Sequence, residues 1–153
     1  MQQLLENIKA EILADERFKS CLIYPNARGE FIAPAVFLEV SGYRPGNDPA
    51  TEELALVANV EARVVVDSVA DNAELVCQQL ACEIANIAHL NSFGLNISPA
   101  VVMGVSRDVF KPEFDAFICW MTDWTHEFHI GDSVWNETGL PPHTINIQEY
   151  ING

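Results

Sequence analysis

Hydrophobic and polar residues alternate over two long stretches of the chain. Within residues 53–67, seven apolar residues from Leu54 to Val66 occupy every second position. Residues 115–130 alternate in the same way, with Trp120 and Trp124 among the positions of one face. A period of two is typical of a β-strand that turns one face to a core. The other face of residues 53–67 is apolar at its ends and polar in its middle, which indicates a face that is only partly covered.

Two other stretches repeat their apolar residues at helical spacing. Residues 2–18 carry a stripe that includes Leu4, Ile8 and Ile12, and residues 71–90 carry a wider stripe that is rich in alanine. Both patterns predict amphipathic helices. We expect the first helix to end near Arg17, where cations suit the negative end of a helix. We expect Asp71 to cap the second helix, with Glu74 completing a capping box.

Shorter β-prone runs fill the remaining part of the pattern. Residues 21–24, 34–40 and 100–110 are predicted strands, and residues 41–51 hold enough Pro, Gly, Asn and Asp to form a loop or hairpin tip. The order is helix, strands, helix, strand, strand, and the last two strands can pair as a hairpin. This order predicts an α+β fold, with an antiparallel or mixed sheet packed by two helices. Residues 1–130 would form one domain, and residues 131–153 would be a loose extension or an arm that adds a strand to a neighbouring subunit.

Charge narrows the classes of partner. The 153 residues contain 8 Lys and Arg against 22 Asp and Glu, which gives a formal net charge of −14. The few cations are scattered along the chain, so we expect neither a grip on nucleic acid nor docking on an anionic membrane. The acidity would serve solubility, or it would make a surface that repels DNA or recognises a basic partner. There is no signal-peptide pattern and no apolar stretch long enough to cross a bilayer, so we expect a cytoplasmic protein or one carried in a larger particle.

The sequence contains no pattern that predicts catalysis. His126 and His129 lie three apart on a predicted strand and would point to opposite faces, so they would not share a metal ion. No nucleophile motif and no phosphate-binding glycine loop is present. The four cysteines are widely spaced, and we interpret them as small core residues in a reducing compartment: Cys21, Cys77, Cys82 and Cys119. We therefore expect a protein that is not an enzyme and uses no cofactor or metal.

Two groups of residues are candidates for partner contacts. The predicted loop at residues 41–51 is a structural loop or a binding element, and in the second case Tyr43, Arg44, Asn47 and Asp48 would reach a partner. Trp120 and Trp124 share one face of a strand. They would pack in the core or form an aromatic patch at a subunit interface.

The order of elements resembles that of the tail terminator proteins of long-tailed phages, the lambda-type terminator among them. An N-terminal helix precedes a strand that leads into a Gly-Tyr loop, PAVFLEVSGY at residues 34–43. A long alternating strand follows, which ends as ARVVVD at residues 62–67, before a helix. The last strand is rich in aromatic residues, DAFICWMTDW at residues 115–124. The resemblance covers about residues 4–130 and does not include the C-terminal extension.

The resemblance implies a ring, usually of six copies, that caps the tail tube. Such a ring ends polymerisation of the tube and offers a surface to which the head is joined. Its implied partners are other copies of the chain, the tail tube protein and a head–tail joining protein, and DNA passes through without specific binding. The ring would be assembled in the host cytoplasm and carried in the virion tail. The alternative is an acidic interaction module, a DNA mimic that inhibits a DNA-binding protein.

Overall fold

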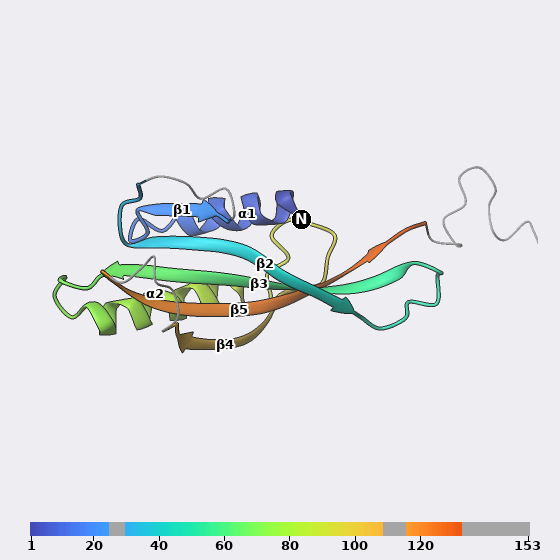
Figure 1. The fold of residues 1–153 in the computed structure, drawn as a ribbon. Helices are drawn as coiled ribbons and strands as arrows, with labels where there is room; N and C mark the ends of the chain where they lie inside the picture. The colour runs from blue at the N-terminus through green and yellow to red at the C-terminus, as the bar shows by residue number, and fades with distance from the viewer. Residues whose placement is uncertain (25–29, 109–115, 133–153) are drawn as a thin grey trace, which may run out of the picture.

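Five strands form one mixed sheet, and two helices complete the fold (Figure 1). The computed structural model describes residues 1–24, 30–108 and 116–132. The sheet order is β1-β2-β3-β5-β4, in which β1 runs parallel to β2 and every other neighbouring pair is antiparallel. The elements are α1 (Gln2–Leu13), β1 (Ser20–Ile23), β2 (Ala35–Pro45), β3 (Leu54–Asp67), α2 (Ala73–Ala88), β4 (Val101–Arg107) and β5 (Phe117–Ile130). The predicted α+β class, its order of elements and the pairing of the last two strands are confirmed.

The main core lies between the helices and one face of the sheet. The stripe of α1 that includes Leu4, Ile8 and Ile12 is fully buried there, as is the alanine-rich stripe of α2. The predicted apolar face of β3 supplies the opposing layer, and Trp124 of β5 is buried with it. Thr122 is one of the buried polar residues on this side of the sheet, and its hydroxyl donates to the Ala81 carbonyl oxygen of α2 at 2.7 Å. This bond satisfies a buried hydroxyl and fixes how α2 lies on β5.

Both helices are shorter than their apolar stripes predict. The first helix ends at Leu13 and not at residue 18. Its chain turns at Asp15, whose carboxylate accepts hydrogen bonds from the backbone and side chain of Arg17. The predicted capping box of the second helix is also wrong, because Asn72 is the N-cap residue, at a φ of 54°, and makes no capping bond through its side chain. Local side-chain hydrogen bonds and backbone geometry determine where α1 ends and where α2 begins. The spacing of apolar residues does not show these local features.

Two strand irregularities change which side chains share a face. The strand β2 continues to Pro45, so Tyr43 and Arg44 lie in a strand and not in the predicted loop. Its register shifts between Val40 and Gly42. A second shift lies between Val102 and Gly104 of β4. Val101 and Met103 both lie on the face away from the helices, and the extra residue brings Val105 to the core side, where it pairs with Thr122.

The face of the sheet away from the helices has no helix over it in the described part of the chain. One end of this face holds a small apolar cluster built around Phe37, Val65 and Cys119. Its middle is charged, and its other end, where β2 stops and β3 begins, combines apolar and polar side chains. The prediction of a partly covered face with a polar middle is therefore confirmed. We call it the uncovered face. Separately, neither described helix is long and apolar enough to span a membrane.

Candidate functional site: the uncovered face of the sheet

A four-residue ionic cluster occupies the middle of the uncovered face. The Arg63 guanidinium donates to Glu39 at 2.5 Å, to Glu61 at 2.7 Å and to Asp108 at 2.8 Å. Glu39 and Glu61 are cross-strand partners on β2 and β3, and Glu61 is paired in turn with Asp123 of β5. All three ligand carboxylates and the arginine are less than a quarter exposed. Three carboxylates therefore share one cation at a site that is largely shielded from water.

The cluster holds its charge because its members are hydrogen-bonded. Burial alone would lower the pKa of the Arg63 guanidinium, since it disfavours the charged form. The hydrogen bonds to Asp108 and Glu39, with the charge of Glu61, outweigh burial, so the pKa of Arg63 lies above its ordinary value. The guanidinium thus stays charged at any pH at which the fold persists. With one positive and three negative groups, the cluster makes the middle of the face acidic.

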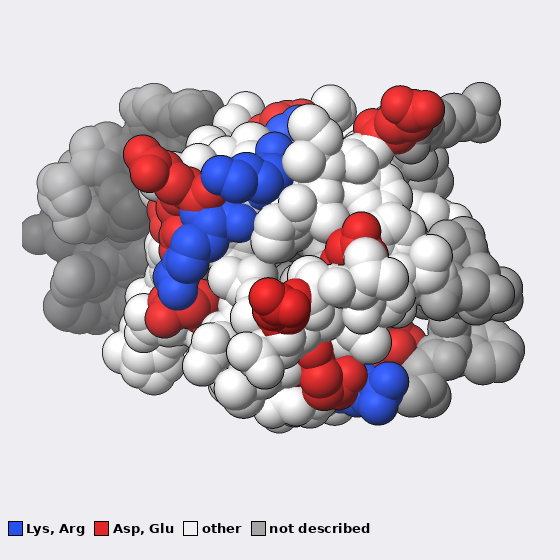
Figure 2. Space-filling view, turned by 90° about the vertical axis from the view of Figure 1, so that its left-hand side faces the viewer, with Lys and Arg blue, Asp and Glu red and all other residues white. Residues whose placement is uncertain are grey.

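Two other basic side chains of the described residues, Arg17 and Arg107, also lie against carboxylates. Arg17 pairs with Asp15 and Glu83, and Arg107 lies 3.6 Å from Glu74. Figure 2 views one end of the molecule, where basic side chains lie beside acidic ones and do not form a broad basic surface. The carboxylates beside these basic side chains reduce the attraction that this end of the molecule would have for a nucleic-acid backbone.

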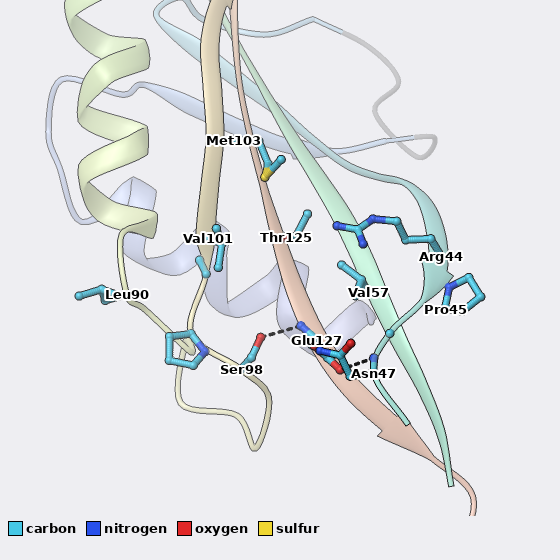
Figure 3. A pocket seen from close by; sticks show the side chains of 13 residues that line it. Arg44, Pro45, Asn47, Val57, Leu90, Ser98, Val101, Met103, Thr125 and Glu127 are labelled. Atoms are coloured by element: carbon cyan, nitrogen blue, oxygen red, sulfur yellow. Dashed lines mark hydrogen bonds between the residues drawn. The ribbon is translucent and has the colours of Figure 1, made fainter. Parts of the chain in front are cut away.

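A groove of about 620 Å³ lies at the end of the uncovered face where β2 stops. We call it the hairpin groove, because the end of β2 and the first residues of the loop between β2 and β3 form one of its sides. Its floor includes Val57 and Thr125, and its other side is formed by Val101 and Met103 of β4. Figure 3 shows Met103 and Arg44 reaching over the sheet from its opposite sides. Val101 and Met103 are 58% and 59% exposed, which is unusual for apolar residues side by side on an edge strand.

Glu127 ties the loop between β2 and β3 to the groove. Its carboxylate accepts a hydrogen bond from the Asn47 backbone N–H at 3.1 Å, and its own N–H donates to the Ser98 hydroxyl at 2.6 Å (Figure 3). The neighbouring Gly46 N–H donates to the Ala55 carbonyl oxygen. These bonds join three segments that are distant in the sequence and fix the shape of the groove.

We expect Gly46→Ala to weaken this tie. A methyl group at Gly46 would lie 2.7 Å from the Glu127 carboxylate oxygen, so the carboxylate must move away from the Asn47 N–H. Urea unfolding should show a loss of about 1 kcal/mol, the usual contribution of one such hydrogen bond. Gly42→Ala is the matched control, because nothing lies within 4 Å of a methyl group there. Equal losses at the two glycines would contradict the assignment.

A buried histidine fixes the segment that leads into β4. The Trp124 indole N–H donates to His126 Nε2 at 3.0 Å, so this nitrogen must be an acceptor and the proton lies on Nδ1. Nδ1 in turn donates to the Ser98 carbonyl oxygen at 2.8 Å. Burial lowers the pKa of His126, and the bond to Ser98 offsets this only in part. His126 is therefore a neutral structural residue, on the opposite face from His129, as the alternation predicts.

The predicted contact residues do not form one surface. Tyr43 is 52% exposed and packs edge-on against the Phe128 ring, whereas Arg44, its neighbour in the strand, lines the groove on the opposite face. Asp48 accepts a hydrogen bond from the Ala50 N–H within the loop. Asn47 makes the backbone bond to Glu127 described above. Of the predicted loop residues, Arg44 and Asn47 thus lie together at the hairpin groove.

The two tryptophans belong to the core side of the sheet. Trp124 has no exposed surface, so the core interpretation holds for it and it cannot contact a partner in this fold. Trp120 is partly buried, and its indole N–H donates to the Glu74 carboxylate at 3.0 Å. Neither ring contributes to the uncovered face.

Three of the four cysteines are removed from solvent. Cys21, Cys77 and Cys119 are buried, and Cys82 is exposed. Burial raises the pKa of the Cys21 and Cys77 thiols to about 12, so they stay protonated and are poor nucleophiles. Within residues 1–24, 30–108 and 116–132, no group of three His, Cys, Asp or Glu side chains could hold a metal ion.

Sequence reasoning missed the residues that define this face. Arg63 and Glu61 were visible only as polar positions in the middle of a predicted strand, and Asp108 lay near the end of another predicted strand, with no signal that the three side chains meet. Their convergence depends on the insertion of β5 between β3 and β4 and on the pairing of β2 with β3. A useful signal was present in the two opposite charges at alternate positions of an otherwise apolar strand.

The geometry defines an α+β domain with helices on one face of its sheet and an acidic, partly apolar surface on the other. Comparison with known proteins adds no family to this description: no protein-family model and no curated protein matches the chain.

Proposed function

We propose that the chain is a structural protein of a long-tailed phage or prophage, a tail terminator that assembles into a ring on the finished tail tube. The observation that carries the proposal is the uncovered face, with its exposed apolar residues beside a shielded acidic cluster. Monomeric proteins rarely leave such an edge strand and sheet face open, because these attract other chains. The element order that resembles the terminator family supports the particular assembly.

The two edge strands of the sheet differ, which favours a ring over a symmetric dimer. One edge is formed by β1, which has four residues, and the other by β4, which has seven. A contact between two unlike surfaces joins copies head to tail, and it closes into a ring when the rotation between copies is suitable. In the proposed assembly the ring ends tube polymerisation and offers its free side to the head–tail joining protein.

The acidity has a physical use in this assembly. Six copies that each carry −14 would together carry −84 formal charges. Carboxylates around a central hole would repel DNA and keep it from adhering during passage. The same charge opposes assembly, so we expect added salt to strengthen association by screening the repulsion between copies. The proposed role is structural and requires no catalytic residue, cofactor or metal.

Tail length is the most direct test of the proposed function. Deleting the gene from the phage or prophage that encodes it should give overlong tails by electron microscopy, because nothing then stops addition of tube subunits. Supplying the wild-type gene in trans should restore normal length. Tails of normal length after deletion would contradict the terminator assignment.

Sedimentation of the purified protein separates the ring from the DNA mimic. A hexamer of the 17.0 kDa chain would have a mass of about 102 kDa, and its fraction should rise between roughly 50 mM and roughly 300 mM salt. A DNA mimic would stay a monomer or dimer and would bind a DNA-binding protein in competition with DNA. A monomer at both salt concentrations would therefore count against the ring.

A further inference from the structure

The hairpin groove combines an apolar side with a cation, Arg44, that forms no ion pair with another described residue, although Glu127 lines the same groove. Its apolar side is formed by Val101 and Met103, and the opposite side carries Arg44 (Figure 3). Among the described residues, Arg17, Arg63 and Arg107 form ion pairs, but Arg44 forms none. An exposed apolar pair that faces an available guanidinium suits a ligand with apolar side chains next to a carboxylate.

We propose that the hairpin groove binds the C-terminal segment of a second copy of this chain, centred on Ile145, Ile147 and Glu149. These residues recur at every second position, so an extended backbone would place two apolar side chains and one carboxylate on the same face. The isoleucines then pack on Val101 and Met103, and the Glu149 carboxylate meets the Arg44 guanidinium. This inference rests on the proposed function only in requiring that copies associate.

The charge of the C-terminal segment fits this groove. Residues 133–153 contain two glutamates and no lysine or arginine. A cation that pairs with a glutamate of this segment must therefore come from another part of the protein. Arg44 is exposed at the groove and forms no ion pair with a described residue. An interfacial ion pair of this kind fixes register and offsets part of the repulsion between acidic copies.

The path of β5 favours a neighbouring copy over the same chain. Thr125 and Glu127 of β5 line the groove, and the strand then continues to Ile130, paired only with β3. Figure 1 shows this end of β5 running out beyond the helices and β4. The described strand therefore ends past the groove, at Ile130, so the segment that follows would have to reverse direction to enter the groove of its own chain. Fully extended, these 21 residues would span about 70 Å, whereas five paired strands are only about 24 Å across. The segment is long enough to reach a neighbouring copy.

Disulfide trapping in the full-length protein tests the proposal. In a Cys82→Ser background, which removes the exposed thiol, Met103→Cys and Ile147→Cys are placed on separate chains with different tags and mixed under mild oxidation. We expect a disulfide between the two tagged chains, because the proposed contact brings the two Cβ atoms close enough to bond. Val69→Cys replaces Met103→Cys in the control. Val69 is 86% exposed and follows the far end of β3, away from the groove.

The yield of the mixed disulfide decides the proposal. We expect it to be about tenfold higher with Met103→Cys than with Val69→Cys, because a disulfide tolerates only a narrow range of separations. Equal yields would overturn the proposal. So would a chain with both Met103→Cys and Ile147→Cys that closes only on itself, since the segment would then occupy its own groove. Sedimentation of the same samples distinguishes the two proposals. A hexamer that forms without the mixed disulfide would contradict only the binding of the C-terminal segment in the groove. A disulfide-linked dimer that never forms a hexamer would contradict only the ring.

A charge exchange tests the partner assigned to Arg44. In the trapping assay, Arg44→Glu should reduce the mixed disulfide about fivefold, and adding Glu149→Arg on the tail-donating chain should restore most of it, as expected for a direct ion pair. Arg44 is exposed, so circular dichroism should show an unchanged fold. A loss of trapping that Glu149→Arg does not restore would contradict the assigned pair.

Discussion

Arg63→Met should destabilise the fold by about 3–5 kcal/mol, the cost of removing one partner from a largely buried ionic cluster. The substitution keeps most of the side-chain volume but leaves Glu39, Glu61 and Asp108 without their shared cation. Three carboxylates that are less than a quarter exposed would then repel one another in a poorly hydrated site. Urea unfolding at neutral pH measures the loss.

A rescue variant separates charge from packing at this cluster. Adding Glu39→Gln and Glu61→Gln to Arg63→Met removes two of the uncompensated charges, so it should recover a large part of the lost stability. Arg17→Met is the matched control, since Arg17 also contacts two carboxylates but is 53% exposed, and its loss should leave the unfolding midpoint nearly unchanged. If the triple variant is no more stable than Arg63→Met, the effect lies in packing and not in electrostatics.

Acidification should weaken the fold through His126, from about pH 6.5 downward. Burial holds the pKa of His126 below its ordinary value of 6.5, so the unfolded chain binds a proton more readily than the folded one. The stability that His126 contributes is therefore fully present above the pKa that His126 has in the unfolded chain. It is lost as the pH falls from that value toward the lower pKa of His126 in the folded chain. Protonation would also put a hydrogen on Nε2, which faces the Trp124 N–H donor. Urea unfolding at several pH values between about 7.5 and about 5.5 measures this slope.

Substitution of His126 should abolish that slope and lower stability at pH 7. His126→Ala leaves the buried Trp124 N–H without its acceptor and the Ser98 carbonyl oxygen without its donor, for an expected cost of about 3 kcal/mol. The difference from the wild type should narrow as the pH falls, since the wild type alone loses this contribution. His89→Gln is the control, because His89 is exposed, and it should keep the wild-type slope. A slope that persists in His126→Ala would assign the pH dependence to other groups.

The sequence alone determined the class of fold and most of its elements. The period-two pattern of residues 53–67 and 115–130 gave the two long central strands, because alternation is required of a strand with one covered face. The same pattern separated His126 from His129 and predicted the polar middle of the uncovered face. The helical stripes located both helices but not their ends, where Asp15 and Asn72 acted through local backbone geometry.

The tertiary structure decided the features from which the function is argued. Arg63 meets Glu39, Glu61 and Asp108 only because strands distant in the sequence become neighbours, and no local pattern encodes that order. The register shift in β4 moves Val105 to the core side of the sheet, since one extra residue in a strand changes the face of the side chains that follow it. The core position of Trp124 was one of two predicted alternatives, and packing against the helices selected it. Periodicity thus fixed which residues point the same way, and the pairing of strands fixed which of them meet.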